Sequence, residues 1–483
     1  MTSDTDKHFS HQQFEQARQA RDSRFDGRFF IGVKTTGIYC RPICPVKMPL
    51  ARNVQFYLTA AAASEAGFRP CLRCRPEASP GTPAWMGTST TVKRGLQLIS
   101  EGALDEDSIE ALSDRLGVTS RHLCRLFAQH LGASPVSVAQ TRRLHFAKKL
   151  LDETRLSMTD IALSSGYRSV RRFNDHIKQV YGRPPSLLRR EAMDHKGAFS
   201  LKLSYREPFD FSSILSFLAV RAIPDVETVT DSAYSRTIIV GGVASRLTVK
   251  KHAVEAALLV AIETDDAKLL FQIMTRVKNL FDLDADPAEV TSVLERDPDI
   301  QKLVLQSPGQ RVPGCWSPFE IAVRAIVGQQ VSVKGATTVM GRIAAQYGQQ
   351  TEFGLCFPEP QALADLDITT LSMPQKRAQA IKDLSHRVAE GHIRFDPDVA
   401  TETLVEQLTS IKGIGPWTAQ YIAMRALNDP DAFLDGDLVL LKVARSYLGV
   451  ETRQGLLDRA ERWRPWRAYA GMHLWRASAQ LEN

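Results

Sequence analysis

The sequence lacks the features that define several protein classes. No apolar run approaches the roughly 20 residues that a membrane-spanning helix needs, so we expect no transmembrane segment and no membrane partner. The first residues show neither a basic-then-apolar pattern nor a small-residue cleavage site, so we expect a cytoplasmic protein without a signal peptide. Seven cysteines in 483 residues are too few for a disulfide scaffold. No coiled-coil heptad repeat is found, which makes a monomer the expected state.

The length and composition of the chain indicate several globular domains. A length of 483 residues predicts about three or four domains, and 43% hydrophobic with 24% charged residues is ordinary for globular proteins. Charge is distributed unevenly. Residues 1–200 carry 30 Lys and Arg against 19 Asp and Glu, a net charge of +11, whereas residues 201–483 carry 31 against 35, a net charge of −4. The first part therefore favours a polyanionic partner, although a solvated basic surface is the common alternative.

Four cysteines form two closely spaced pairs, Cys40-x3-Cys44 and Cys71-x2-Cys74. Two short chelating pairs that the fold brings together are typical of a tetrahedral four-thiolate zinc site. We therefore predict one Zn2+ held by these four residues. The alternative is a set of buried cysteines without a metal.

The segment around these pairs, with TTGIYCRPIC and GFRPCLRCRPE, resembles the amino-terminal zinc domain of the Ada family over about the first 80 residues. The resemblance implies that Cys40 is both a zinc ligand and a sacrificial nucleophile that takes a methyl group from a methylphosphotriester in DNA. Zinc would keep its sulfur as the thiolate. Methylation would remove about one negative charge and so weaken repulsion from DNA phosphates. Flanking arginines are candidate phosphate contacts: Arg41, Arg69, Arg73 and Arg75.

Residues 93–195 are predicted to form short amphipathic helices that contain an internal repeat. Gly117 interrupts the first helical pattern and Ser120 is expected to cap the next helix. The same arrangement recurs with Gly166 in the turn. Three pairs of residues are each 50 residues apart: Leu123 and Phe173, Phe127 and Ile177, and Gly132 and Gly182. Two helix-turn-helix units joined by a helix around residues 143–151 resemble the AraC-type DNA-binding family. That resemblance implies two recognition helices in successive major grooves.

Several polar side chains of the two predicted recognition helices are candidates for DNA contact. They are Ser120, Arg121 and His122 in the first helix, and Ser169, Arg171, Arg172 and Asn174 in the second. Arginine favours guanine and asparagine favours adenine where they reach base edges. Phosphate contact or simple solvation is the alternative for each of them. For a promoter-binding regulator, RNA polymerase is a further expected partner.

The pattern changes near residue 197, where a domain boundary is predicted. Alternating segments FSLKLSY, SRTIIVG and ASRLTVK indicate strands, and the chain is mostly helical beyond Pro313. Residues 408–443 contain the string GIGPWTA and then DGDL. Gly413 and Gly415 permit a tight hairpin whose backbone amides can bind a phosphate. Trp417 and Tyr421, four residues apart, share one helix face.

This combination resembles the helix-hairpin-helix Gly/Pro-rich-loop-Asp superfamily of DNA glycosylases, over roughly residues 200–483, and within it the AlkA-type 3-methyladenine glycosylases. The resemblance implies that Asp437 is catalytic, in preference to Asp435, and that the hairpin glycines Gly413 and Gly415 contact DNA. It implies no cofactor for the glycosylase. The aromatic positions for the damaged base map to Phe217, Trp417, Tyr421 and Trp475. Phe217 and Trp475 as core aromatics are the alternative.

The implied chemistry suits these residue types. A glycosylase extracts the nucleotide from the duplex and then stabilises an oxocarbenium-like sugar with a carboxylate. N3- and N7-alkylated purines carry positive charge, so an aromatic cleft would bind them, which predicts 3-methyladenine and 7-methylguanine as substrates. Trp417 stands where lyase-type relatives carry a lysine nucleophile, so we expect a monofunctional enzyme. Two positions depart from the family: Gln330 replaces the apolar residue that fills the gap left by the flipped base, and Leu438 replaces an aromatic residue.

We therefore expect an α+β multidomain chain. Its predicted parts are a zinc methyl-acceptor domain (1–80), an all-α double helix-turn-helix domain (93–195), a TBP-like α+β lobe (198–310) and an all-α helix-hairpin-helix glycosylase domain (311–483). No PCHR-type methyltransferase site occurs, so repair of O6-methylguanine is not expected. The expected function couples methyl-dependent transcription regulation to excision of alkylated purines from double-stranded DNA. The alternatives are a regulator with an inactive glycosylase half, and a glycosylase whose front half only targets damage.

Overall fold

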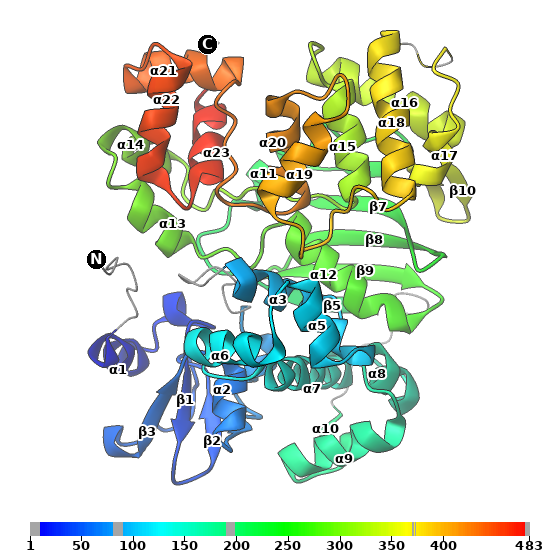
Figure 1. The fold of residues 1–483 in the computed structure, drawn as a ribbon. Helices are drawn as coiled ribbons and strands as arrows, with labels where there is room; N and C mark the ends of the chain where they lie inside the picture. Colours follow the sequence, from blue (N-terminus) through cyan, green and yellow to red (C-terminus); the bar gives the residue numbers. More distant parts are fainter. Residues whose placement is uncertain (1–9, 81–89, 190–198, 370, 372, 479–483) are drawn as a thin grey trace. The chain divides into compact units, whose positions relative to one another are not determined.

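The computed structural model describes residues 10–80, 90–189, 199–369, 371 and 373–478 (Figure 1). Contacts divide the chain into two compact units. The first contains residues 1–206 and 254–275, and the second contains residues 207–253 and 276–483. The boundary predicted near residue 197 lies within 190–198, outside the described residues.

The first unit begins with a four-stranded sheet in the order β3-β1-β2-β4. Its strands are β1 (Phe30–Val33), β2 (Ile38–Cys40), β3 (Val54–Tyr57) and β4 (Arg69–Pro70). β1 pairs antiparallel with β2 and β3, whereas β2 and β4 run parallel. Helices α1 (His11–Ala20) and α2 (Ala60–Glu65) accompany the sheet, and Phe14 of α1 packs against the buried Phe29 with ring centroids 4.5 Å apart. The parallel pair brings the two cysteine-bearing segments side by side.

Eight helices of the described residues follow in this unit. They are α3 (Thr90–Ser100), α4 (Ala103–Glu106), α5 (Ile109–Arg115), α6 (Ser120–Leu131), α7 (Pro135–Glu153), α8 (Met158–Ser164), α9 (Val170–Tyr181) and α10 (Pro185–Leu188). The pairs α5–α6 and α8–α9 form the two predicted helix-turn-helix units. Gly117 and Gly166 lie in their turns with φ of +68° and +82°, a left-handed conformation that favours glycine. Gly132 and Gly182 end α6 and α9 with the same φ of +69°.

The cap of α6 corrects one sequence expectation. Thr119, not Ser120, is the N-cap, and its hydroxyl accepts the backbone N–H of His122. Ser120 is the first helical residue. Both hydroxyl residues can cap a helix, so composition alone did not distinguish them.

Two strands of the sheet-forming region also belong to the first unit. β5 (Phe199–Ser204) and β9 (Ala257–Thr264) pair antiparallel, with Leu201 opposite Val260 and both side chains wholly buried. They are followed by the short η4 (Ala267–Leu269) and by the start of α12 (Leu270–Leu280). The FSLKLSY pattern therefore does form a strand.

The second unit contains the other predicted strands. β6 (Glu227–Val229), β7 (Ala233–Val240) and β8 (Val243–Lys251) form antiparallel ladders, with Gly241 and Gly242 in the tight β7–β8 turn at positive φ. Helix α11 (Phe211–Ala219) precedes them and carries Phe217. Burial alternates along β8, which agrees with one face packed on a core, whereas most residues of β7 are buried.

The rest of the second unit is mainly helical. Its longer helices are α13 (Pro287–Leu294), α14 (Pro298–Gln306), α15 (Pro318–Val327), α16 (Val333–Tyr347), α18 (Gln375–Ala389), α19 (Thr401–Thr409), α20 (Pro416–Ala426), α21 (Leu438–Leu448), α22 (Arg453–Ala460) and α23 (Arg467–Ser478). Short elements α17 (Pro360–Ala364), β10 (Gln349–Thr351) and β11 (Gly354–Cys356) lie between α16 and α18. Among the described residues, no helix has the length and apolarity to cross a membrane. The α+β multidomain class is confirmed.

Candidate functional site

The four predicted cysteines converge at the edge of the small sheet. Cys40 ends β2 and Cys71 directly follows β4, so the parallel register places both at neighbouring strand ends, with the Cys71 N–H donating to the Tyr39 carbonyl at 3.0 Å. Cys44 and Cys74 follow in tight turns. All four sulfur atoms lie within 4.8 Å of one another and all four residues are buried.

This donor set fits a zinc ion. A tetrahedron with Zn–S bonds of about 2.3 Å has sulfur–sulfur edges of about 3.8 Å, within the observed spread. Hydrogen bonding to the thiol of Cys44, then to the other two thiols, and burial raise the pKa of Cys40 above its ordinary value. A bound divalent cation supplies the opposite effect and keeps the sulfur as a thiolate. The four cysteines are thus the residues that would hold Zn2+.

The arginines around the cysteines divide into two groups. Arg41 is largely buried, pairs with Asp26 and donates to the Cys74 carbonyl at 3.1 Å, while Arg75 pairs with Asp152 at 3.0 Å. Both therefore have partners within the protein. Arg69 and Arg73 are exposed and remain candidates for phosphate contact.

The predicted DNA-reading side chains lie at the starts of α6 and α9. Arg121, Arg171, Arg172 and Asn174 are exposed, while Ser120 is half-buried at the first turn of α6. Arg171 is 92% exposed and its nearest ion-pair distance, to Asp175, is 3.9 Å. The opposite faces carry the buried Leu123, Phe127, Phe173 and Ile177. The arrangement leaves the polar faces accessible.

The glycine hairpin joins α19 to α20. Gly413 has a φ of +101°, and Gly415 is the N-cap of α20 without a side-chain cap. Both are exposed, and a Cβ on Gly415 would meet nothing within 4 Å. The first amides of α20 are therefore available to an oxygen ligand.

Asp437 is the N-cap of α21 and receives four N–H donors. Its Oδ1 accepts the backbone N–H groups of Val439 and Leu440, each at 2.9 Å, and the indole N–H of Trp475 at 3.2 Å. Its Oδ2 accepts only the indole N–H of Trp417, at 3.1 Å, among the described residues. The donors fix the carboxylate and leave acceptor capacity on Oδ2. Asp435 instead pairs with Arg453 at 2.6 Å.

The predicted aromatic residues gather beside this carboxylate. The rings of Trp417 and Tyr421 are stacked, with centroids 5.6 Å apart and planes 10° apart. The ring centroids of Trp475 and Tyr421 are 6.5 Å apart. Phe217 reaches the same group through Arg425, whose guanidinium is 4.9 Å from the Phe217 ring and donates to the Tyr421 hydroxyl at 2.9 Å. By contrast, Trp463 and Trp466 are fully buried in the core.

Two arginines of this site were not predicted from sequence. Arg221 lies 3.8 Å over the Phe217 ring, and Arg425 is held by the Gly314 carbonyl at 2.7 Å. Burial opposes ionisation of Tyr421, but the charges of Arg425, Arg221 and Arg324 outweigh it and lower the pKa of that hydroxyl. Arg221 follows Phe217 by four positions, and Arg425 follows Tyr421 by four. This spacing, which in a helix places each pair on one face, is the sequence pattern that could have predicted both arginines. The aromatic group is thus more cationic than expected.

The loop after α15 contains the first departure from the family pattern. Gln330 is exposed with a left-handed φ of +55°, and its neighbour Val331 is 43% exposed. The side chain of Gln329 ties this loop to the hairpin, because it donates to the Gly413 carbonyl at 2.9 Å and to the Thr418 hydroxyl at 3.0 Å. Leu438, the second departure, is 81% exposed beside Asp437.

Four family models match the chain in succession. They are the metal binding domain of Ada (residues 13–77), a helix-turn-helix domain (112–191), the AlkA N-terminal domain (200–317) and the HhH-GPD superfamily base excision DNA repair protein (323–467). The order is the one that the sequence predicted.

Known proteins match either the whole chain or its glycosylase part. The "Probable bifunctional transcriptional activator/DNA repair enzyme AlkA" of Mycobacterium tuberculosis (strain CDC 1551 / Oshkosh) is 40% identical over 96% of both chains. The "DNA-3-methyladenine glycosylase 2" of Escherichia coli (strain K12) is 37% identical over 56% of this chain and 95% of its own length. A solved 3-methyladenine DNA glycosylase from Archaeoglobus fulgidus shares the fold, with a TM-score of 0.52 and 18% identity over 58% of this chain and 99% of that one. The chain therefore belongs to the family of bifunctional transcriptional activators and DNA repair enzymes of the AlkA type.

Proposed function

We propose that this chain excises alkylated purines through Asp437 and accepts a methyl group on Cys40. It combines an Ada-like regulator and methyl acceptor with an AlkA-like 3-methyladenine DNA glycosylase, and double-stranded DNA is the partner. The observation that carries the excision proposal is the partly unsatisfied Oδ2 of Asp437 beside the stacked Trp417 and Tyr421. The regulator with an inactive glycosylase half is not favoured, because the carboxylate and the aromatic residues converge.

Base release proceeds by hydrolysis of the N-glycosidic bond. The bond breaks with its electron pair moving to the base nitrogen, which neutralises a purine alkylated at N3 or N7. Positive charge then develops on C1′ and O4′ of the sugar, where a fixed carboxylate stabilises it. Water adds to C1′ and loses a proton, so the products are the free base and an abasic site. Asp437 Oδ2 stabilises the charge and orients this water, and its acceptor capacity beyond the Trp417 indole supports this role.

The positions of the other groups support a monofunctional enzyme on flipped nucleotides. Trp417 occupies the helix position facing Asp437, so no amine is present there to form a Schiff base with the sugar. The hairpin of Gly413 and Gly415 offers backbone amides to a DNA phosphate. Trp417, Tyr421, Trp475 and Phe217 provide faces for the extruded base. Gln330 enters the gap that the base leaves, and its exposure on the loop after α15 supports this role.

In the front half, Cys40 attacks the methyl carbon of a methylphosphotriester. A sulfur–carbon bond forms, the carbon–oxygen bond breaks, and the phosphate oxygen keeps the electron pair as a diester. The four cysteines would hold Zn2+, which would keep the Cys40 sulfur as the thiolate. The methylated site carries about one negative charge less, which favours approach to DNA. The exposed polar starts of α6 and α9 then read promoter bases, with Arg121, Arg171, Arg172 and Asn174 as contacts.

The same proposal includes recruitment of RNA polymerase by the promoter-bound protein, action as a monomer and a cytoplasmic location. Two HTH units within one chain support monomeric promoter binding, since dimeric readers need two copies for two half-sites. Free thiols clustered as a metal site support a reducing compartment.

The test is incubation of purified protein with methylated duplex DNA, followed by chromatography of the released bases. We expect free 3-methyladenine and 7-methylguanine, with strands that break only after alkaline treatment of the abasic sites. In the same sample, mass spectrometry should find a methyl-sized increment on the Cys40 peptide. Absence of free base would refute the excision proposal, and absence of the increment would leave zinc with a structural role alone.

A further inference from the structure

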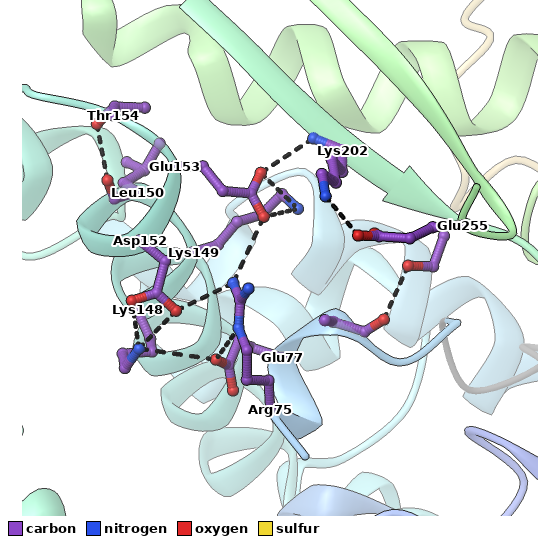
Figure 2. A network of polar contacts seen from close by, with 12 residues as sticks. Arg75, Glu77, Lys148, Lys149, Leu150, Asp152, Glu153, Thr154, Lys202 and Glu255 are labelled. Atoms are coloured by element: carbon purple, nitrogen blue, oxygen red, sulfur yellow. Dashed lines mark hydrogen bonds and ion pairs between the residues drawn. The ribbon is translucent and has the colours of Figure 1, made fainter. Parts of the chain in front are cut away.

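Helix α7 ends in two acidic residues that lie in a nearly buried ion network (Figure 2). The side chains of Asp152 and Glu153 are 1% and 12% exposed. Lys148 contacts Asp152 at 2.5 Å, and Lys149 contacts Glu153 at 3.2 Å. Low exposure limits screening by salt, so charges in this network act strongly on one another.

Helix α7 contacts residues that flank the zinc ligands. Arg75 directly follows Cys74, and its guanidinium lies 3.0 Å from Asp152 and 3.6 Å from Glu153. The backbone of Arg75 is fixed in a left-handed conformation, with φ +54°, and its N–H donates to the Cys71 carbonyl at 3.1 Å. At the other ligand pair, Tyr39 precedes Cys40, is wholly buried, and its hydroxyl bonds His145 of α7 at 2.8 Å. The zinc loops therefore contact α7 at two points.

The end of α7 also contacts strand β5, whose residues 200–204 lie within the segment matched by the AlkA N-terminal domain model. β5 is at the end of its sheet, where outward N–H groups need partners. The Lys202 N–H donates to Glu153 Oε2 at 3.0 Å, and the Lys202 ammonium contacts Glu255 at 2.7 Å. The Ser204 hydroxyl donates to the Ala78 carbonyl at 2.8 Å. The regulator thus covers the edge of β5.

Aromatic packing supports the same contact. Phe271, at the start of α12, meets Phe146 of α7 edge to face with centroids 4.8 Å apart, and the Arg142 guanidinium lies 4.3 Å over its ring. All of these residues belong to the first compact unit. A path of direct contacts therefore runs from the zinc ligand Cys74 through Arg75 and Glu153 to β5.

We propose that α7 transmits the state of the zinc site to strand β5 of the AlkA-type region, through Arg75 and Glu153. The proposal rests on the proposed methyl transfer to Cys40. That transfer removes about one negative charge from the zinc loop. The electrostatic attraction of Arg75 to its own loop therefore changes relative to its attraction to the two carboxylates of α7. Glu153, which Arg75 and the Lys202 N–H share, carries the change to β5. Because such a link is reciprocal, a disturbance of β5 also alters the zinc loop.

Hydrogen–deuterium exchange of the zinc-loaded full chain tests the link at the peptide that spans β5. Glu153→Ala removes the acceptor of the Lys202 N–H, and we expect exchange of this peptide to rise about tenfold. Arg75→Gln, a substitution outside β5, should raise it several-fold. Glu110→Ala, at an exposed glutamate of α5, is the matched control and should leave it unchanged. Methylphosphotriester DNA should change the β5 exchange of the wild-type chain but not that of Arg75→Gln, with methylphosphotriester-free duplex as the reference.

The outcomes separate this link from the proposed methyl transfer. If mass spectrometry shows the methyl increment on Cys40 and β5 exchange stays unchanged, the link is wrong although the acceptor is real. If no increment forms, the methyl-acceptor proposal fails, and an unchanged β5 in zinc-replete Arg75→Gln would then overturn the link. If Arg75→Gln loses zinc, the methylated wild-type chain decides the question.

Discussion

Replacing Asp437 by asparagine removes one charge while keeping most of the local structure. Asparagine is as good an N-cap as aspartate, and its carbonyl can still accept the two backbone N–H groups of α21 and the Trp475 indole. Only the Oδ2 position changes, from an acceptor of the Trp417 indole to an NH2 group. For a carboxylate about 4 Å from the cationic sugar, an effective dielectric constant of about 20 gives a stabilisation of about 4 kcal/mol. The release rate should therefore fall about 10³-fold.

Single-turnover release of 7-methylguanine from a defined duplex measures this effect. The Asp435→Asn variant is the matched control, because Asp435 is two residues away and pairs with Arg453 on the surface. We expect the control to retain the wild-type rate, and both variants to bind an abasic duplex normally. A wild-type rate for Asp437→Asn, or an equal loss in both variants, would refute the assigned role.

Three further predictions concern the hairpin, the zinc site and acid stability. Gly413→Ala forces an alanine to φ +101°, so it should weaken duplex binding and lower the free energy of unfolding, measured by thermal unfolding, by about 1–3 kcal/mol. Gly415→Ala is the control, because Gly415 has a φ of −89°, and it should change neither duplex binding nor stability by much. Cys44→Ser should lower the zinc content below one per chain, measured by metal analysis, and destabilise the first unit. Burial opposes ionisation of Asp297, but hydrogen bonds from Arg459 outweigh it and lower its pKa to about 2. The contribution of Asp297 to the free energy of unfolding is complete above its unfolded pKa of about 4 and is lost as the pH falls towards 2. The urea midpoint of the Asp297→Asn variant should therefore decline less steeply with falling pH over that range.

The sequence predicted features that depend on local spacing. The two cysteine pairs indicated a four-thiolate site because each pair can chelate one ion, and the parallel pairing of β2 and β4 then supplies the convergence. The internal repeat predicted both helix-turn-helix units because glycine is needed at the turns, where Gly117 and Gly166 both have positive φ. Trp417 and Tyr421 stack because four residues separate them on one helix.

Features that depend on distant contacts were not predicted. Arg425 reaches the site because the Gly314 carbonyl, 111 residues away in sequence, holds its guanidinium. Gln329 bonds the hairpin across 84 residues, which no local pattern reveals. The contact of β5 with α7 depends on Glu153 and Lys202, which are 49 residues apart in sequence. One local prediction was also wrong, because both threonine and serine can cap a helix: Thr119 caps α6 in place of the predicted Ser120.

The most direct test compares two duplexes that differ only in the charge of the sugar at the damaged position, a cationic azasugar and the neutral tetrahydrofuran analogue. Contacts of the regulator with DNA cancel in the ratio of the two affinities. The wild-type chain should bind the cationic duplex at least about 100-fold more tightly, because the carboxylate of Asp437 is arranged for a developing cation. Asp437→Asn should bind both duplexes equally. Equal binding by the wild-type chain, or a preference that survives in Asp437→Asn, would contradict the account.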